Sequence, residues 1–469
     1  HTARAWVFDV AENLTGYYFL VSSKKSGNCY DYIIKIFHEK LFPNGVIEKI
    51  EGDYYSSDYV KEKAEYLLNI WIETKKLDFY TSLLNIENLD LKMESLKIGN
   101  KRKLIIYEDI KTSYIKDYNL YTEKSLYSDI LLEDLKEELK SIGEKPFRAE
   151  QIFKWLFVEK VKEFEEMTNI SKELRQKLEE NYDICNFEIE RKLVSKDGTI
   201  KYLFNIDGIN NVETVLMKYK YGYSVCVSCQ IGCKMGCKFC ASTGIPFVRS
   251  LTPGEIVEQI LAIEQDTGNK VSNVVFMGIG EPMDNFENIM KTIAILNNPK
   301  GFAIGARHMS VSTSGVVPRI YEFADRNAQS TLAISLHSPN NETRSSMMPV
   351  NKAYPIEELM KACKYYMEKT NRRISFEYAL SKGYNDSIED AENLSQLFHK
   401  TLGHLNLVHV NLIPINKIEN GVYNQSSIES IMKFRDYLNS KGITATIRRE
   451  LGSDIEAACG QLRRKNLKK

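Results

Sequence analysis

The chain has 469 residues, a length that predicts two or three domains of ordinary size. Lys and Arg together number 63, and so do Asp and Glu, so the overall charge does not favour a nucleic-acid partner. Hydrophobic residues make up 43% of the chain, but no run approaches the roughly 18 consecutive apolar residues of a membrane-spanning helix. The 9 cysteines are an odd number and no signal-peptide pattern is visible, so we expect no disulfide framework, no membrane partner and a cytoplasmic location.

Residues 1–125 are rich in Tyr, Lys and Ile, and no chemical motif can be assigned to them. The spacing of apolar residues over 57–85 predicts one amphipathic helix, and residues 102–107 have the composition of a strand. We therefore expect an additional α+β region here, without an assigned role.

A small helical accessory domain is predicted over residues 126–205. Leucines that alternate with acidic residues predict a helix over 129–142, and a second helix is expected over 147–157. The second helix carries several aromatic residues around Arg148 and Lys154. Such a unit suits the docking of RNA, although core packing alone would also explain the aromatic residues.

An α/β catalytic domain is predicted over residues 206–469. Turn signals at Asp197-Gly198 and Asp207-Gly208 predict strands over 192–219, across the start of this domain. Beyond the capping box Thr252-Pro253-Gly254-Glu255, strands alternate with helices, which predicts a parallel sheet in a partial (β/α)6 barrel. The expected strands are 271–277, 308–313, 331–337, 373–380, 407–414 and 444–448, and the expected helices include 355–370, 388–402 and 427–441.

The most informative motif is the triplet Cys233, Cys237 and Cys240, with the spacing C-x3-C-x2-C. Three thiolates can hold three irons of a 4Fe–4S cluster and leave the fourth iron open to a ligand. Structural zinc is the alternative, because Cys226 and Cys229 could complete a site with four sulfur ligands. We favour the cluster, since this spacing is unusual for zinc.

Two further features match radical S-adenosylmethionine (SAM) enzymes, whose open iron binds the amino and carboxylate groups of SAM. Phe239 lies one residue before the last cysteine, as in their cysteine motif. The expected strand 271–277 runs into Gly278-Ile279-Gly280-Glu281-Pro282, where glycines let the backbone approach a ligand and Glu281 supplies an acceptor for an ammonium group. Polar residues also end the later strands, where ligands of parallel sheets bind.

From Leu131 to Leu462 the chain resembles the bacterial adenine carbon-2 methyltransferases of the radical SAM superfamily. These enzymes methylate an adenosine in the peptidyl transferase centre of 23S rRNA and another in tRNA, 3′ of the anticodon. The matching text comprises Val212-Glu213-Thr214-Val215, Cys226-Val227-Ser228, Gln230-Ile231-Gly232-Cys233, Gly280-Glu281-Pro282, Ser312-Thr313-Ser314-Gly315-Val316-Val317-Pro318, Ser335-Leu336-His337, Gly452-Ser453-Asp454-Ile455 and Ala457-Ala458-Cys459-Gly460-Gln461-Leu462.

The resemblance implies roles for individual residues. Cys459 matches the cysteine that is first methylated on sulfur, Cys226 matches the second catalytic cysteine, and Glu213 matches the presumed proton acceptor. The residues implied in SAM binding are Gly280, Glu281, Ser312, Ser335, Leu336, His337 and Asn416. The resemblance also implies 23S rRNA and tRNA as partners, a flavodoxin or ferredoxin as reductant, and a monomer.

The implied chemistry follows from the substrate. Carbon 2 of adenine is not nucleophilic, so the thiolate of Cys459 would accept a methyl group from one SAM first. A second SAM yields a 5′-deoxyadenosyl radical that takes hydrogen from this methyl group, and the resulting methylene radical adds to carbon 2. Cys226 or Glu213 then helps to remove the ring proton, and a disulfide between Cys226 and Cys459 forms as the product leaves.

Two residues depart from the family pattern: Ile279 replaces the usual Met, and Cys229 stands where Ser or Thr is usual. We expect Cys229 to be inert. Two alternative functions stay open at this point. One is the related methylase that acts on carbon 8 of the same adenine, and the other is a catalytically silent RNA-binding iron–sulfur protein.

Overall fold

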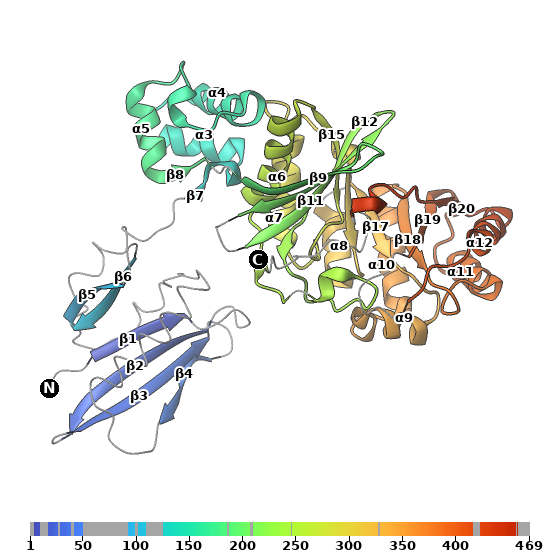
Figure 1. The fold of residues 1–469 in the computed structure, drawn as a ribbon, viewed down its shortest axis with the longest axis horizontal. Coiled ribbons are helices and arrows are strands. Elements are labelled where there is room, and N and C mark those ends of the chain that lie inside the picture. The colour runs from blue at the N-terminus through green and yellow to red at the C-terminus, as the bar shows by residue number, and fades with distance from the viewer. Residues whose placement is uncertain are drawn as a thin grey trace. The chain divides into compact units, whose positions relative to one another are not determined.

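The structure is a computed structural model that describes residues 4–9, 17–26, 29–38, 42–49, 92–98, 102–108, 125–184, 187–206, 210–244, 246–326, 329–415, 423–455 and 457. The chain divides into two compact units, His1–Glu123 and Lys124–Lys469, which we describe separately (Figure 1). No helix within the described residues is long and apolar enough to cross a membrane.

The described residues of the first unit form a six-stranded sheet in the order β4-β3-β2-β1-β6-β5, with all neighbours antiparallel. Strand β6 confirms the strand expected over 102–107, whereas the helix expected over 57–85 lies outside the described residues. The strands are β1 (Arg4–Asp9), β2 (Tyr17–Ser26), β3 (Cys29–His38), β4 (Phe42–Lys49), β5 (Lys92–Ile98) and β6 (Arg102–Glu108).

The second unit begins with the expected group of small helices, which pack around buried leucines and aromatic residues. A bond from the Gly254 N–H to Asp129 Oδ1, 2.6 Å long, joins this group to the start of helix α6. Short strands β7 (Ser125–Leu126) and β8 (Tyr182–Asp183) pair with each other. The helical segments are η2 (Tyr127–Asp129), α3 (Leu132–Ser141), α4 (Phe147–Lys154), the π-helical turn η3 (Trp155–Glu159), η4 (Phe164–Glu166) and α5 (Lys172–Asn181).

The rest of this unit is built on a ten-stranded sheet in the order β20-β19-β18-β17-β16-β15-β12-β11-β10-β9. From β12 to β20 all neighbours are parallel, which confirms the predicted α/β fold with a partial barrel, and β11, β10 and β9 extend it as antiparallel strands. The antiparallel strands are β9 (Glu188–Val194), β10 (Ile200–Asn205) and β11 (Asn211–Tyr219). The parallel strands are β12 (Gly222–Cys226), β15 (Val271–Phe276), β16 (Met309–Thr313), β17 (Thr331–Ser335), β18 (Ile374–Leu380), β19 (Val408–Pro414) and β20 (Thr444–Ile447). A separate pair consists of β13 (Gln230–Ile231) and β14 (Arg249–Ser250).

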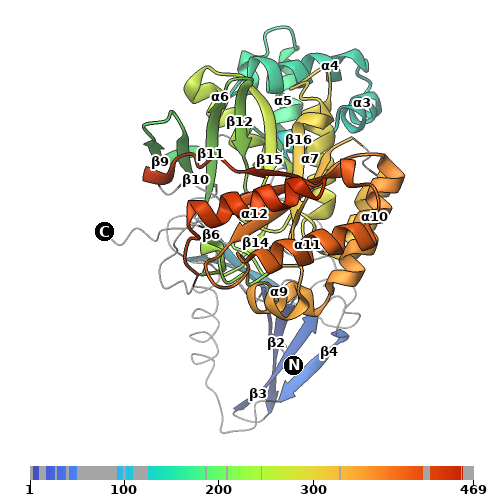
Figure 2. The same cartoon turned by 90° about the vertical axis from the view of Figure 1, so that its right-hand side faces the viewer.

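Helices follow the parallel strands and cover one face of this sheet, as Figure 2 shows for α10, α11 and α12. Helix α6 begins at the predicted capping box, where Thr252 Oγ1 accepts from the Glu255 N–H and Glu255 returns the bond. The helices are α6 (Pro253–Thr267), α7 (Phe286–Asn297), α8 (Val317–Arg326), α9 (Asn341–Met347), α10 (Ile356–Thr370), α11 (Ile388–Thr401) and α12 (Ile428–Ser440), with short 3-10 turns η5 (Ala241–Gly244), η6 (Ala306–His308), η7 (Pro349–Lys352), η8 (Leu405–Leu407) and η9 (Ser453–Ile455).

Alternation along the strands leaves polar side chains on the face that the helices do not cover. In β19, Val408, Val410 and Leu412 are fully buried, while His409 and Asn411 between them are partly exposed. Because successive side chains of a strand point to opposite faces, a strand with this pattern packs one face on helices and presents the other to the barrel interior. The polar lining of the site below follows from this alternation.

Candidate active site

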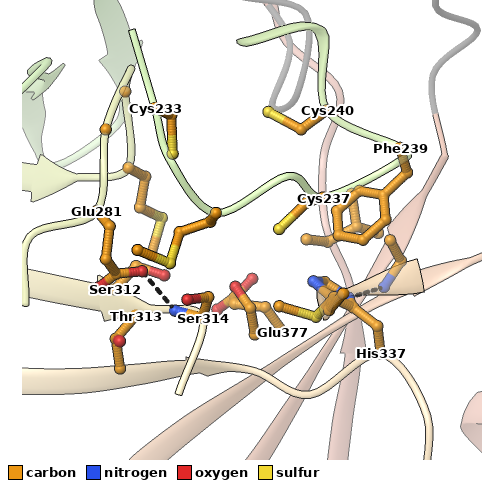
Figure 3. A pocket seen from close by; sticks show the side chains of 18 of the residues that line it. Cys233, Cys237, Phe239, Cys240, Glu281, Ser312, Thr313, Ser314, His337 and Glu377 are labelled. Carbon is orange, nitrogen blue, oxygen red and sulfur yellow. Dashed lines mark hydrogen bonds between the residues drawn. The ribbon is translucent and has the colours of Figure 1, made fainter. Parts of the chain in front are cut away.

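A pocket lies at the carboxyl ends of the parallel strands and is bordered by the cysteine loop that follows β12 (Figure 3). Most of the residues predicted from the sequence to form the site line it together. The predicted residues among its lining are Cys233, Cys237, Cys240, Gly280, Glu281, Ser312, Ser335 and His337. This is the edge at which ligands of parallel α/β sheets bind.

The side chains of Cys233, Cys237 and Cys240 point into a common space at one side of the pocket (Figure 3). Burial raises the pKa of Cys233 to about 12 and raises the pKa of Cys237 further, so iron binding must displace their protons. The Lys238 N–H donates to the Met347 carbonyl at 3.0 Å, which ties the loop to helix α9. Three thiols that converge on one open space fit a 4Fe–4S cluster held at three corners.

The zinc alternative needs a fourth ligand, such as Cys226 or Cys229, beside the cysteine triplet. Among the described residues, no three His, Cys, Asp or Glu side chains are placed to hold one metal ion. A tetrahedral zinc site needs each sulfur about 2.3 Å from the same ion, whereas each sulfur of a cluster binds its own iron. Cys229, which could have supplied a further ligand, is buried in the hydrophobic core, and burial raises its pKa well above the usual value.

The turn after β15 holds the carboxylate of Glu281 in a fixed position. Glu281 is only 3% exposed; its Oε1 accepts from the Met283 N–H at 3.0 Å and its Oε2 from the Ser314 N–H at 2.8 Å. Burial raises the pKa of Glu281, and these donors oppose that shift. Gly280 has a φ of +113°, and a Cβ there would lie 2.7 Å from Gln230 Cβ. Only glycine therefore fits where the turn packs this closely against Gln230. The geometry suits an acceptor for the ammonium group of SAM.

Ser312, Ser335 and His337 bring polar groups to the mouth of the pocket from the ends of β16 and β17. His337 has a φ of +57°, and its Nδ1 accepts from the Ala379 N–H at 2.9 Å, which leaves Nε2 as the protonated nitrogen. Its ring lies edge-on to Phe239, with centroids 4.6 Å apart. Burial, together with the nearby charge of Arg344, lowers the pKa of His337 to about 3, so the ring is neutral at physiological pH.

A pH dependence of stability follows from the depressed pKa of His337. As the pH falls below about 6.5, the unfolded chain takes up a proton on this residue but the folded chain does not, so stability falls until about pH 3. We expect His337→Asn, which suits the positive φ and keeps an acceptor, to reduce the slope by up to ~1.4 kcal/mol per pH unit in this window. Urea unfolding at several pH values checks this, and an unchanged slope would contradict it.

Four further polar residues in or beside the pocket were not predicted from the sequence as site residues. Glu377 and Arg448 line the pocket and lie 3.6 Å apart, and Asn411 donates to Glu377 at 2.7 Å. Arg344 is fully buried beneath the pocket and donates to the carbonyls of Ser314, Ser335 and Leu336. The local signals were the acidic Glu377 within a mainly apolar strand and the basic pair Arg448-Arg449.

Cys226 and Glu213 lie on the same face of the sheet as the pocket-lining Ser312, but they are not among the lining of the pocket. Lys201 is opposite Val215, which is in turn opposite Cys226, so the three residues share one face across β10, β11 and β12. Glu213 lies two residues before Val215 and therefore on the same face. Cys226 packs in a buried cluster with Val215, Met217, Ile279, Leu451 and Ala457, and Met277 joins this cluster to the pocket.

Glu213 forms a buried ion pair that the sequence did not reveal. Lys201 Nζ lies 2.9 Å from Glu213 Oε1, and the two side chains are 7% and 6% exposed. A buried carboxylate without a cation is costly, so Lys201 stabilises the ionised form that a proton acceptor needs.

With Glu213 as the proton acceptor that the family resemblance implies, we expect Lys201→Met to lower the rate of RNA methylation by about 10²–10⁴-fold at neutral pH, because loss of this cation favours the protonated form of the buried carboxylate. The rate should recover as the pH rises, which a lost structural contact would not produce. The double variant Lys201→Met/Glu213→Leu should be more stable than Lys201→Met but inactive at every pH. Rate–pH profiles and urea unfolding check this, and a flat profile in Lys201→Met would contradict it.

Three of the predicted site residues remain, namely Cys459, Asn416 and Leu336. Cys459 and Asn416 lie outside the described residues. The side chain of Leu336 is fully buried in the core, its N–H donates to the Glu377 carbonyl, and it is not among the lining of the pocket. Its implied part in SAM binding, like the other residue roles, stays a prediction.

The partial barrel and the converging cysteine triplet define this protein as a radical SAM enzyme, and comparisons with known proteins agree. Residues 227–395 match the model of the radical SAM superfamily, and residues 128–184 match that of the ribosomal RNA large subunit methyltransferase N-terminal domain. A solved radical SAM methyltransferase from Sphaerobacter thermophilus superposes with a TM-score of 0.68 at 42% identity, and the match covers 72% of this chain and 99% of that one.

Curated relatives carry the assignment further. The chain is 52% identical over 341 residues to a protein of Caldanaerobacter subterraneus subsp. tengcongensis named "Probable dual-specificity RNA methyltransferase RlmN", with 72% of this chain and 98% of that protein covered. A protein of the same name from Bacillus subtilis is 49% identical over 349 residues, with 74% and 95% covered. The chain belongs to the RlmN family of radical SAM RNA methyltransferases, whose cofactors are a 4Fe–4S cluster and SAM.

Proposed function

We propose that this enzyme methylates carbon 2 of one adenosine in 23S rRNA and of another in tRNA, by way of a methyl group carried on Cys459. The names of the relatives support a dual RNA specificity. The observation that carries the proposal is the packing of Ala457, two residues before Cys459, in the same buried cluster as Cys226. Because two residues span at most about 7 Å, Cys459 is within reach of this cluster.

The residues of the chain divide into two groups by what they do. Cys233, Cys237 and Cys240 hold the cluster, and Glu281 accepts a hydrogen bond from the ammonium group of SAM. Ser312, Ser335, His337 and Asn416 bind the remainder of SAM. The bound cluster and SAM supply a 5′-deoxyadenosyl radical. This group lies at the carboxyl ends of the parallel strands.

The second group handles the methyl group and the proton. Cys459 accepts a methyl group on sulfur and presents it to carbon 2 of the adenine. Glu213, held ionised by Lys201, accepts the proton that leaves the ring. The thiolate of Cys226 then attacks the sulfur of Cys459 and forms a disulfide. The electron pair of the broken carbon–sulfur bond stays with the carbon, which takes up a proton to become the new methyl group.

Mass spectrometry of nucleosides from modified RNA tests this function directly. Purified enzyme, supplied with SAM and a reductant, is expected to convert adenosine into 2-methyladenosine in both 23S rRNA and tRNA fragments. Formation of 8-methyladenosine instead would favour the carbon-8 methylase. Failure to cleave SAM with a reconstituted cluster would favour a catalytically silent RNA-binding protein.

We also propose that a flavodoxin or ferredoxin supplies the electrons, that the enzyme acts as a monomer, and that it works in the cytoplasm, where its RNA substrates are used. The segment 126–205, whose helices end with α5 and whose last two strands, β9 and β10, join the ten-stranded sheet, is proposed to dock RNA. Within it, Arg148 donates to Gln151 and to the Asn169 carbonyl, and Lys154 pairs with Glu159 at 3.2 Å, so these two cations also serve the domain's own structure.

A further inference from the structure

The turn between β9 and β10 binds a segment near the C-terminus that lies 255 to 259 positions later in the sequence. Ser195 Oγ donates to Asp454 Oδ1 at 2.5 Å, and the Lys196 N–H donates to Asp454 Oδ2 at 3.3 Å. The Gly452 N–H donates to Asp197 Oδ2 at 2.9 Å. Three hydrogen bonds thus join a tight turn to the segment that leads to Cys459.

The turn is built to present the carboxylate of Asp197 outward. Asp197 Oδ1 accepts from the Thr199 N–H at 2.8 Å inside the turn, which leaves Oδ2 for Gly452. The Asp197 N–H donates to Ser195 Oγ at 3.3 Å, so the two side chains that hold the segment also position each other. Burial alone would raise the pKa of Asp197, but donation from the Gly452 and Thr199 N–H groups lowers it to about 2, and the carboxylate is ionised.

The segment is folded tightly against this turn. Gly452 has a φ of +64°, and a Cβ there would lie 2.8 Å from Ala457 Cβ and 2.9 Å from Thr199 Cγ2. The Ala457 N–H donates back to the Gly452 carbonyl at 2.9 Å. Both Leu451 and Ala457 are buried in the cluster that contains Cys226. The segment therefore lies on the face of the sheet that carries Cys226.

We propose that Ser195 and Asp197 are positioning residues of the methyl transfer, which fix residues 451–455 and 457 so that Cys459 meets both the pocket and Cys226. This inference rests on the proposed role of Cys459 as methyl carrier. A chain of two residues spans at most about 7 Å, so the position of Ala457 limits how far along the chain the Cys459 backbone can lie from the cluster that contains Cys226. Neither Ser195 nor Asp197 lines the pocket, so each acts through the segment.

Hydrogen exchange in the reconstituted full-length enzyme tests the structural half of this inference. In Ser195→Ala/Asp197→Ala, exchange of the Gly452 and Ala457 amides is expected to become about tenfold faster. Asp197→Asn, which keeps the turn but weakens the acceptor, should be intermediate. The control Asp325→Ala removes a carboxylate that bonds Tyr365 and Lys369 on the outer helices, and it should leave these amides unchanged. Equal exchange in the double variant and the wild type would overturn the inference.

The coupling of SAM cleavage to methylation tests the functional half. A misplaced Cys459 wastes radicals, so the ratio of 5′-deoxyadenosine to methyladenosine should rise roughly tenfold in the double variant, with the KM for RNA unchanged. Faster exchange with a wild-type ratio would overturn the positioning role. If the wild-type enzyme forms no methyladenosine, the proposed function fails, whereas the exchange result still decides whether the turn fixes the segment.

Discussion

Replacing Cys459 by alanine is expected to abolish methyladenosine formation, with a loss of at least ~10⁴-fold, because it removes the thiol proposed to carry the methyl group to carbon 2. Mass spectrometry of the purified protein should find no methylated cysteine in this variant. Cys226→Ala should fail differently, since the methyl carrier is intact but nothing can break its bond to the substrate. This variant is expected to accumulate an enzyme covalently joined to RNA, visible as a shifted band in a denaturing gel.

Two other cysteines provide matched controls. Cys229 lies three residues from Cys226 but is buried in the core, and Cys363 is fully buried on α10. Burial raises the pKa of both thiols, which keeps them protonated and unreactive. Cys229→Ala and Cys363→Ala should therefore retain methylation. Release of free methyladenosine by Cys226→Ala would contradict the role proposed for Cys226.

Arg344→Met is expected to destabilise the second unit by roughly 3–4 kcal/mol, the largest effect on stability that we predict. Arg344 is fully buried, and its guanidinium donates to the carbonyls of Ser314 at 2.6 Å, Ser335 at 3.1 Å and Leu336 at 3.1 Å. Burial lowers the pKa of Arg344 to about 10, so it still carries its charge at neutral pH. Methionine fills much of the space but removes the Arg344 donor from these carbonyls and from Asn351 Oδ1, and of the three carbonyls Leu336 keeps a bond from the Ser338 N–H at 2.8 Å.

The same variant should also weaken SAM binding, because Arg344 joins the ends of the two strands that carry Ser312 and Ser335. Urea unfolding and the Kd for SAM measure the two effects. Arg326→Met is the control: its guanidinium is 43% exposed and pairs with Glu287 and Glu322, so its loss should cost less than about 1 kcal/mol. Equal stability of the two variants would contradict the expected role of Arg344.

Features set by residues close together in the chain could be predicted from the sequence. The strand predictions for β15 to β20 agree with the structure to within a few residues, because each rests on a local run of apolar residues between turns. The capping box at Thr252 and the tight turn at Asp197-Gly198 likewise depend only on neighbours. The cysteine triplet belongs to the same class, since one short loop brings its three sulfurs together.

The side chains that support the site could not be predicted in this way. Lys201 reads as one more lysine in a strand, and only the register of β10 against β11 places it beside Glu213. Arg344 reads as a surface residue of a short helix, yet it is buried beneath strand ends that precede it in the chain. Sequence periodicity gives the face of an element but not the element that covers that face.

The sequence by itself determined the chemistry, because the cysteine triplet, the Gly-Glu-Pro turn and the family motifs each depend on adjacent residues. The tertiary structure alone decided how the SAM pocket and the residues proposed to handle the methyl group and the proton are brought together. It packs Leu451 and Ala457 against Cys226 and binds the same segment to the turn at Ser195 and Asp197. These partners are more than 200 positions apart, and such contacts form only when the whole sheet folds, since no local preference selects one distant partner over another.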